Sequence, residues 1–422
     1  MQRRWILFII GMLIVLIGLG SYLQSNRALE PIKVGVLHSL SGTMAISESP
    51  VLDATLLAIE EINAQGGVLG RPLEAVIVDG QSDWEIFAQE SARLITQEEV
   101  QVVFGCWTSA CRKTVRPVFE ARNHLLIYPV QYEGLESSPN IIYTGSSPNQ
   151  QIIPAVRWGM ENLGDRVFLV GSDYVFPRTA HEIMRRQIVS LRGEVVGESY
   201  LLLGSTDVGP VIEAIVAAQP DMILNTINGD SNIAFFRALR EAGINSAEIP
   251  TISFSIAEPE LLTLDIQNVV GDYAAWTYFQ TIESPENTAF VARFHQRYGT
   301  ERVISDPMEA AYFGVHLWAQ AVETAGTTQP SVVRLALQRQ SFNAPGGVVY
   351  VDPNTQHTWK TVRIGQIRPD GQFDVVWSSV NPIRPQPYPT YLTQEGWEDF
   401  LNGLYLGWGQ QWENPRMEDN DA

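Results

Sequence analysis

The chain has 422 residues, of which 45% are apolar, and a formal net charge of −19 from 47 acidic and 28 basic side chains. This length suits two medium-sized cores better than one. The acidic balance argues against a nucleic-acid-binding protein, and it does not favour an anionic ligand. Because the acidic residues are spread along the chain, we interpret the charge as that of a well-hydrated, soluble surface.

The N-terminus has the pattern of an export signal. Arg3 and Arg4 precede an uncharged apolar stretch that runs from Trp5 to Leu19 and continues weakly to Leu23. This stretch is intermediate in length between a cleaved signal peptide and a membrane-spanning helix, and no lipobox cysteine decides between them. We therefore expect residues 1–27 to be either a signal peptide or an uncleaved transmembrane anchor. In both cases the body of the protein lies outside the cytoplasmic membrane, in the periplasm or an equivalent compartment.

From residue 32 onward, short apolar runs alternate with amphipathic segments, a pattern typical of repeated βαβ units. Strands are predicted over Ile32–His38, Leu73–Asp79, Val100–Cys106, Leu125–Val130, Val167–Gly171, Met222–Ile227, Thr251–Ser255 and Gly271–Tyr278. Helices are predicted over Val51–Ala64, Trp84–Ile95, Pro177–Leu191 and Ser231–Ala242. Two doubly wound parallel sheets would account for this number of units.

The pattern changes after Asp306. A long helix is predicted from there to Glu323, and a second one over Ser331–Gln340. An antiparallel hairpin follows, because Thr358–Ile367 and Gln372–Ser378 flank an Asp-Gly pair, which is a strong signal for a tight turn.

Several segments resemble, in order and spacing, the urea-binding proteins of ABC urea importers, within the branched-chain amino acid and amide binding family. The segments are His38–Thr43 (HSLSGT), Gly105–Lys113 (GCWTSACRK), Tyr128–Gly134 (YPVQYEG), Ser138–Asn140 (SPN), Pro148–Gln150 (PNQ), Gly171–Arg178 (GSDYVFPR), Asn228–Ser231 (NGDS) and Ser305–Tyr312 (SDPMEAAY). The resemblance covers about residues 32–390. The amide-sensing regulator of aliphatic amidase operons is similar but less close.

This resemblance implies an α/β fold of the type I periplasmic-binding-protein class, with two doubly wound parallel-sheet lobes joined by three crossovers and a ligand in the cleft between them. Residues 31–149 and 279–341 would form lobe 1, and residues 150–278 and 342–385 would form lobe 2. Residues 386–422 would be a C-terminal extension whose last residues are disordered. We expect the extension to pack on lobe 2 through Trp397, Phe400, Leu404 and Tyr405, in preference to contacting a partner.

The ligand of an open parallel sheet binds beyond the carboxyl ends of the strands. Hydroxyl, amide and aromatic side chains dominate there, beginning with Ser39 and Thr43 after the first strand. The candidate ligand-binding residues are Ser41, Trp107, Thr108, Ser109, Tyr128, Val130, Tyr174, Phe176, Asn228, Asp230, Ser255 and Tyr278. Each also has a structural interpretation, since aromatic residues pack in cores and Thr108–Ser109 could simply cap a helix. For Asp230 we favour a helix cap over ligand contact.

Urea is small, planar and neutral, with one carbonyl acceptor and four N–H donors. Its site needs flat walls and fixed hydrogen-bond partners, not compensating charges. Aromatic side chains could supply the walls, and backbone N–H groups at Thr108–Ser109 would suit the ligand carbonyl if a helix begins there. The amide regulator carries a small hydroxyl residue at the position that matches Val130, which is consistent with a different ligand.

The two cysteines, Cys106 and Cys111, could form a disulfide only if their Cα atoms lay within about 7 Å. A helix starting at Ser109 would direct the two side chains differently, so we expect two buried thiols. The neighbouring pair Arg112–Lys113 is interpreted as a solvated helix face.

The chain carries no recognisable catalytic motif. Its six histidines, His38, His124, His181, His295, His316 and His357, show no metal-ligand spacing, and we interpret most of them as surface or capping residues. It lacks a nucleophile elbow, a phosphate-binding loop and a dinucleotide fingerprint. We therefore expect no enzyme activity, no metal site and no cofactor.

Together these features predict an extracytoplasmic substrate-binding protein that closes around urea or a closely related short-chain amide. It would deliver the ligand to ABC permease subunits served by cytoplasmic ATPases. An alternative with the same fold is a short-amide sensor that signals to a regulatory partner.

Overall fold

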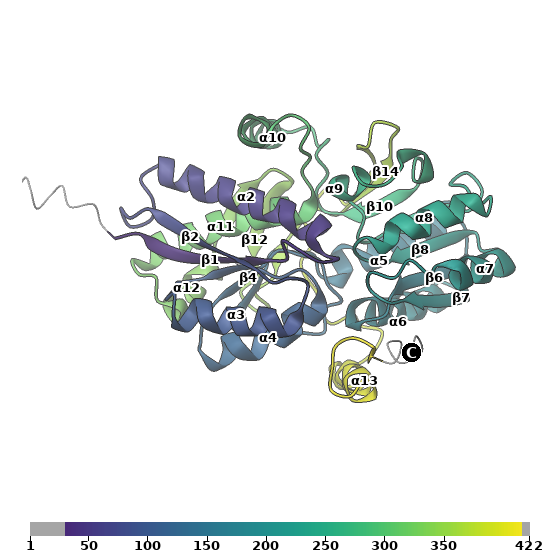
Figure 1. Cartoon of the computed structure of the whole chain (residues 1–422), viewed down its shortest axis with the longest axis horizontal. Helices are drawn as coiled ribbons and strands as arrows, with labels where there is room; N and C mark the ends of the chain where they lie inside the picture. The colour runs from purple at the N-terminus through teal and green to yellow at the C-terminus, as the bar shows by residue number, and fades with distance from the viewer. Residues whose placement is uncertain (1–29, 416–422) are drawn as a thin grey trace, which may run out of the picture.

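Two α/β lobes lie side by side in the computed structural model, which describes residues 30–415 (Figure 1). The predicted leader, residues 1–27, and the last residues of the C-terminal extension fall outside the described range. Within residues 30–415, none of the helices combines the length and the apolar character needed to cross a membrane.

The first lobe is built on a parallel sheet with the strand order β2-β1-β3-β4-β5. Its strands are β1 (Ile32–His38), β2 (Leu73–Asp79), β3 (Val103–Gly105), β4 (Leu126–Tyr128) and β5 (Ile141–Tyr143). They are connected by α2 (Ala45–Ala64), α3 (Trp84–Thr96) and α4 (Ser109–Ala121). Strands β1 and β2 have the predicted bounds, whereas α2 begins six residues earlier than its apolar spacing indicated.

The second lobe is built on a seven-stranded sheet with the order β15-β14-β10-β9-β8-β6-β7. Its parallel strands are β6 (Arg166–Ser172), β7 (Glu194–Leu201), β8 (Met222–Thr226), β9 (Thr251–Ser253) and β10 (Tyr273–Trp276). Its helices are η1 (Pro148–Gln150), α5 (Ile152–Asn162), α6 (Val175–Ser190), α7 (Gly209–Ala218), α8 (Ser231–Glu241), α9 (Glu258–Leu261) and η2 (Ile266–Asn268). The predicted hairpin is confirmed, since β14 (Arg363–Ile367) and β15 (Phe373–Ser378) pair antiparallel at the edge of this sheet.

The chain returns to the first lobe between the two parts of the second sheet. This return segment contains α10 (Pro285–Tyr298), α11 (Asp306–Ala325), α12 (Pro330–Leu337), β11 (Ser341–Ala344), β12 (Gly347–Val351) and β13 (Thr358–Trp359). Helix α11 packs against α2 and against β3 and β4. Val349 and Val351 belong to the first hydrophobic core. The segment 342–359, which the sequence assigned to lobe 2, therefore lies with the first lobe.

Three crossovers connect the lobes, and a buried lysine joins them. Lys360, in the third crossover, donates a hydrogen bond to the backbone carbonyl of Thr144 in the first crossover at 3.2 Å. Its ammonium also lies 3.6 Å from Asp306. The other oxygen of Asp306 accepts a hydrogen bond from the N–H of Thr277, in the second crossover, at 2.9 Å. The Lys360–Asp306 ion pair and its hydrogen bonds thus link all three crossovers between the lobes.

The C-terminal extension packs on the second lobe through Trp397 and Leu404, as predicted, whereas the rings of Phe400 and Tyr405 contact Trp397 and Trp412 of the extension itself. It forms α13 (Gln394–Gly407), which lies below α6 near the junction of the lobes in Figure 1. Trp397 and Leu401 are buried in the core that contains Val175 and Met184 of α6.

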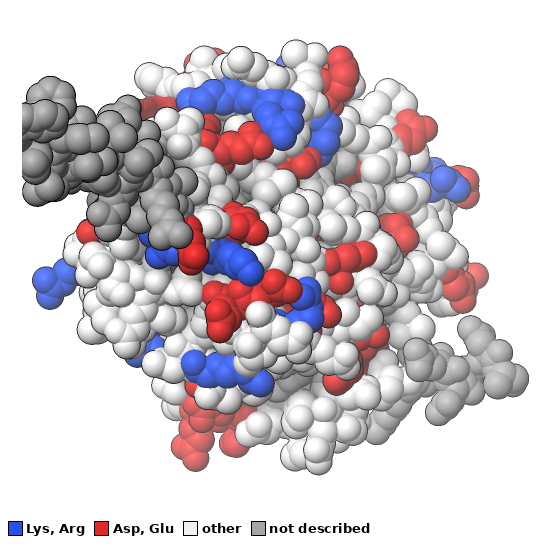
Figure 2. Space-filling model, turned by 60° about the vertical axis from the view of Figure 1, so that its left-hand side comes forward, with Lys and Arg blue, Asp and Glu red and all other residues white. Residues whose placement is uncertain are grey.

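On the face drawn in Figure 2, acidic and basic side chains are interspersed. Ion pairs of this kind join α10 to α2, where Arg293 and Arg297 meet Glu61 and Glu60. Such exposed pairs contribute little to stability, so we interpret this face as an ordinary hydrated surface.

Candidate functional site

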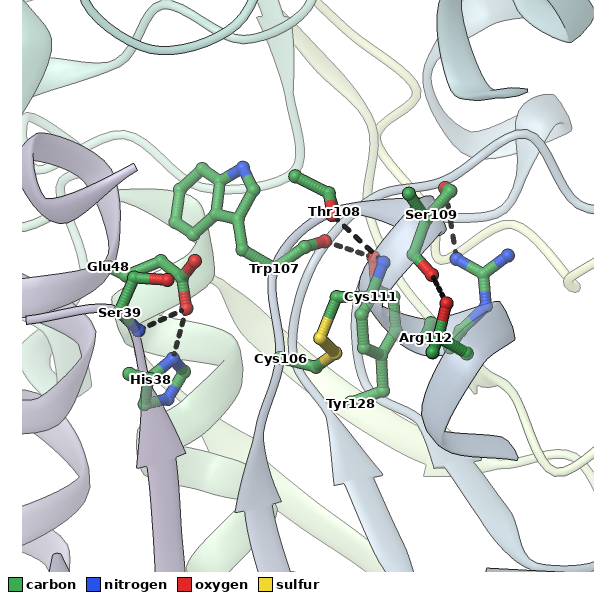
Figure 3. The surroundings of a disulfide bond; sticks show 12 residues. His38, Ser39, Glu48, Cys106, Trp107, Thr108, Ser109, Cys111, Arg112 and Tyr128 are labelled. Atoms are coloured by element: carbon green, nitrogen blue, oxygen red, sulfur yellow. Dashed lines mark hydrogen bonds and ion pairs between the residues drawn. A yellow bond between two sulfur atoms is a disulfide. The ribbon is translucent and has the colours of Figure 1, made fainter. Parts of the chain in front are cut away.

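The loop between β3 and α4 carries the central candidate residues (Figure 3). Gly105 lets this loop approach β1, because a Cβ atom there would lie 2.0 Å from the carbonyl oxygen of Leu37. Helix α4 begins at Ser109, and the Thr108 hydroxyl accepts a hydrogen bond from the N–H of Cys111 at 3.0 Å. Thr108 is therefore the N-cap, and the helix start that the carbonyl-binding hypothesis requires is present.

The expectation of two free thiols is wrong, because Cys106 and Cys111 form a disulfide. Cys106 adopts a left-handed backbone conformation, with φ of 68°, which the sequence pattern did not reveal. This turn leaves the two Cα atoms 6.1 Å apart, within the range that a disulfide can span. The bridge encloses Trp107, Thr108, Ser109 and Ala110 and ties the strand end to the first turn of α4.

Trp107 and Tyr128 are held together at the ends of β3 and β4. The Tyr128 hydroxyl donates a hydrogen bond to the backbone carbonyl of Trp107. The indole of Trp107 points away from the strand ends in Figure 3. Its side chain is 3% exposed, and its Nε1–H finds no acceptor among the described residues. A buried N–H without an acceptor costs about 1–3 kcal/mol, so this group is suited to bind a ligand.

A buried ion network supports Ser109. Arg112 donates hydrogen bonds to Glu133 at 2.9 Å, to Glu136 at 3.0 Å and to the Ser109 hydroxyl at 3.0 Å. The Ser109 hydroxyl itself donates to Glu133. Lys113 lies 3.4 Å from Glu136 and 3.7 Å from Glu133.

The prediction of a solvated Arg112–Lys113 face is therefore wrong. Both side chains are buried, because Glu133 and Glu136, 20 or more residues later in the chain, neutralise them. Burial alone would raise the pKa of Glu136, but Arg112, Lys113 and Arg116 hold it well below its usual range. Burial lowers the pKa of Lys113, and the two glutamates offset only part of this effect.

A second buried polar pair, which the sequence did not single out, lies at the end of β1. His38 Nδ1 is 3.2 Å from Glu48 of α2, and the same carboxylate oxygen accepts from the N–H of Ser39 at 2.9 Å. His38 Nε2 and Glu48 Oε1 have no partner among the described residues. His124, His181 and His357 are also buried, so the prediction of mostly surface histidines is wrong.

The second lobe presents Tyr174 and Phe176 at the start of α6. Both rings are buried in a core that also contains Ala110, from the first turn of α4 in the other lobe. Burial raises the pKa of the Tyr174 hydroxyl, and the nearby Tyr128 and Glu133 raise it further. Tyr174 therefore faces the Trp107–Tyr128 side of the cleft.

The two lobes are closed on each other. The Ser47 hydroxyl donates to Glu260 across the cleft at 2.6 Å, and the Gln131 amide donates to the carbonyl of Phe254 at 2.9 Å. A further bond joins the Thr43 hydroxyl to Asp230. Asp230 occupies the N-cap position of α8, as the helix-cap interpretation expected. Its side chain, however, accepts no hydrogen bond from the first turn of the helix, so the capping role is wrong. Its carboxylate holds the closed state instead.

The remaining candidates make structural contacts within one lobe. Ser41 is exposed and donates to Asp79 at 2.7 Å. The amide of Asn228 donates to the Thr226 carbonyl at 3.1 Å, and the hydroxyl of Ser255 donates to the Ile227 carbonyl. Tyr278 lies in the first core and donates to Asn287 at 2.7 Å, and Val130 is buried in the same core.

The structure therefore places Trp107, Thr108, Ser109 and Tyr128 together at the strand ends of the first lobe, and Tyr174 and Phe176 at the start of α6, with Tyr174 near Tyr128. It places no described group of three or more potential metal-ligating side chains together. The arrangement combines aromatic rings, an unpaired indole N–H and the first-turn N–H groups of a helix, which are the kinds of group that bind small polar molecules.

Comparison with protein families matches residues 32–394 to the periplasmic binding protein domain. Leu/Ile/Val-binding protein homolog 6 of Brucella melitensis biotype 1 is 23% identical over 347 residues, which cover 80% of this chain and 88% of that one. A limonene hydroxylase of Geobacillus stearothermophilus is 38% identical over 120 residues, which cover 28% of this chain. The chain spans about a fifth of that relative, since the match covers 22% of it.

Solved structures share the fold. A solute-binding protein of an ABC transporter from Rhodopseudomonas palustris HaA2, in complex with p-hydroxybenzoic acid, has a TM-score of 0.76 and 24% identity over 85% of this chain and 98% of that one. The branched-chain amino acid transporter substrate-binding protein of Streptococcus pneumoniae, in complex with isoleucine, has a TM-score of 0.73 and 21% identity over 84% of this chain and 100% of that one. The family match over residues 32–394 shows that the chain belongs to the periplasmic binding protein family, whose members are extracytoplasmic solute-binding proteins.

Proposed function

We propose that the protein captures urea, or a closely related short-chain amide, in the cleft between its lobes and delivers it to the permease of an ABC importer. The single observation that carries this proposal is the buried, unpaired indole N–H of Trp107 beside the N-terminus of α4. Both features donate hydrogen bonds, and a ligand carbonyl is a suitable acceptor for them.

The charge balance of the site supports a neutral ligand. Arg112 and Lys113 are each paired with Glu133 and Glu136, so two buried cations face two buried carboxylates, and the partly exposed Arg116 also contacts Glu136. A benzoate anion or a zwitterionic amino acid would require uncompensated charges that this network does not offer. The comparison proteins bind isoleucine and p-hydroxybenzoic acid, so both compounds serve as informative competitors.

The aromatic groups support a small planar ligand. Trp107, Tyr128 and Tyr174 are all buried, and the hydroxyl of Tyr128 is already bonded to the protein backbone. Their rings can enclose a flat molecule, whereas its amide N–H groups need acceptors such as the carboxylate of Glu133. Closure of the lobes would then exclude water and trap the ligand for transfer.

Isothermal titration calorimetry of the purified protein tests the proposal. The titrants are urea, formamide, acetamide, isoleucine and 4-hydroxybenzoate. We expect urea to bind most tightly, and isoleucine and 4-hydroxybenzoate to give no heat of binding. A preference for acetamide would indicate the amide-sensor alternative, and tight binding of isoleucine or 4-hydroxybenzoate would overturn the proposed ligand class.

A further inference from the structure

Residues 408–415, which follow α13, lie beyond the segment that matches the periplasmic binding protein domain. We call this segment the C-terminal strap, because it contacts both lobes. Helix α13, from which it emerges, lies near the junction of the lobes in Figure 1.

The strap is anchored to the second lobe. The carbonyl of Trp412 accepts a hydrogen bond from the N–H of Val175 at 2.9 Å, and the N–H of Asn414 donates to the carbonyl of Asp173 at 3.1 Å. The first bond satisfies an N–H in the first turn of α6, which has no acceptor within the helix. Trp408 is buried in the same core as Trp397 and Tyr174. The strap is thus bonded to the residues on both sides of Tyr174, one of the candidate ligand-binding residues.

The strap also reaches the first lobe. The indole N–H of Trp84, at the start of α3, donates to the carboxylate of Glu413 at 2.9 Å. The ammonium of Lys113, in α4, lies 4.8 Å from the centre of the Trp412 ring. Trp84 packs against the core of each lobe. Opening of the cleft would separate α3 and α4 from α6, so these two contacts to the first lobe would break while the second-lobe anchor stays intact.

We propose that the C-terminal strap is an intramolecular latch that favours the closed state of the two lobes. A hydrogen bond to a charged group that exists only in the closed state shifts the open–closed equilibrium toward closure, because it contributes nothing to the open state. The inference concerns closure alone, so it does not depend on the identity of the ligand.

Small-angle X-ray scattering of the ligand-free full chain measures closure directly through the radius of gyration. The variants are Trp84→Phe, which keeps the ring and removes the N–H, Glu413→Ala, and the double variant. Each single variant is expected to shift the equilibrium about tenfold toward the open state and to increase the radius of gyration. The double variant is expected to add nothing further, because both changes remove the same bond.

Glu398→Ala is the matched control, since it also removes a carboxylate from the extension. Glu398 is exposed on α13 and bonds only to Gln394 of the same helix among the described residues. Circular dichroism melting of every variant verifies that it is folded. An unchanged radius of gyration in Trp84→Phe and Glu413→Ala, or an equal change in Glu398→Ala, would overturn the latch.

Discussion

The hydroxyl of Tyr128 donates a hydrogen bond to the backbone carbonyl of Trp107, the residue directly before the N-cap of α4. A phenol has one donor, so this bond leaves the Tyr128 side chain mainly a ring that a ligand can pack against. The indole N–H of Trp107, by contrast, has no acceptor among residues 30–415. In the proposed function, recognition of the ligand carbonyl is therefore assigned to Trp107 and to the first turn of α4.

Replacing Trp107 with phenylalanine separates recognition from stability. We expect Trp107→Phe to weaken urea binding about 10- to 100-fold, because it removes a donor worth about 1–3 kcal/mol in a buried site. The melting temperature should fall little, since no protein hydrogen bond is lost. Calorimetric titration and thermal melting check the two effects. Trp318→Phe is the control, because Trp318 is also buried with an unpaired indole N–H, but lies on α11 and not on the loop between β3 and α4. Equal losses of affinity in both variants would contradict the assignment.

Arg112 is expected to contribute strongly to stability. Arg112→Ala leaves Glu133 and Glu136 buried beside Lys113 with too little positive charge, which should lower the free energy of unfolding by about 3–5 kcal/mol. Arg116→Ala, on the same helix, also removes a cation that contacts Glu136, but this side chain is 39% exposed. Arg116→Ala should lower the free energy of unfolding by less than about 1 kcal/mol. Denaturation in guanidinium chloride measures both values without adding urea, the proposed ligand.

The Cys106–Cys111 disulfide should stabilise the protein and fix the ligand loop. Closing a ring of about six residues corresponds to about 2 kcal/mol of stabilisation in the chain-entropy description. We expect the Cys106→Ala/Cys111→Ala variant to lose about this much and to bind urea more weakly, because Trp107 and Ser109 gain freedom. Substitution is preferable to a reductant, since both residues are buried. Unchanged stability and unchanged affinity would show that the helix cap at Thr108 alone holds the loop.

The buried carboxyl of Glu258 predicts that stability falls as the pH rises. Burial raises its pKa from 4.5 to about 8, and the nearby Glu260 and Asp306 add to this effect. The unfolded chain ionises Glu258 above pH 4.5 while the folded chain keeps it protonated up to about pH 8. The stability that the protonated Glu258 allows is therefore fully present below pH 4.5. It is lost progressively as the pH rises from 4.5 to about 8.

Glu258→Gln removes this titration and keeps an acceptor for the N–H of Gln280, which Glu258 binds at 2.8 Å. We expect the melting temperature of this variant to decrease less between pH 5 and pH 8 than that of the parent. Glu248→Gln, a change at an exposed carboxylate, is the control and should leave the slope unchanged. The same slope in all three proteins would contradict the prediction.

Short-range patterns predicted part of the scaffold, although β5, β7, α5 and α7 were not predicted. The bounds of β1 and β2 and the hairpin at Asp370–Gly371 follow from local apolar patterning and turn chemistry. The placement of Trp107, Ser109 and Tyr128 at neighbouring strand ends follows from the same logic.

Contacts between distant parts of the chain could not be predicted in this way. The burial of Arg112 depends on Glu133 and Glu136, and the role of Asp230 depends on Thr43, which lies 187 residues earlier. The disulfide depends on the left-handed turn at Cys106, a conformation that non-glycine residues seldom adopt. The contacts that join the two lobes are also between distant parts of the chain. The sequence could not reveal them, and several predicted site residues, such as Ser41 and Asn228, form hydrogen bonds only within their own lobe.

The return of the chain to the first lobe has a consequence for biosynthesis. The sheet β1–β5 is complete at residue 143, but α11, which packs against β3 and β4, begins only at residue 306. A growing chain therefore carries an apolar sheet face without its covering helix while the whole parallel part of the second lobe is being made. An apolar surface of this kind is prone to aggregation, and the first core cannot be completed before α11 is present.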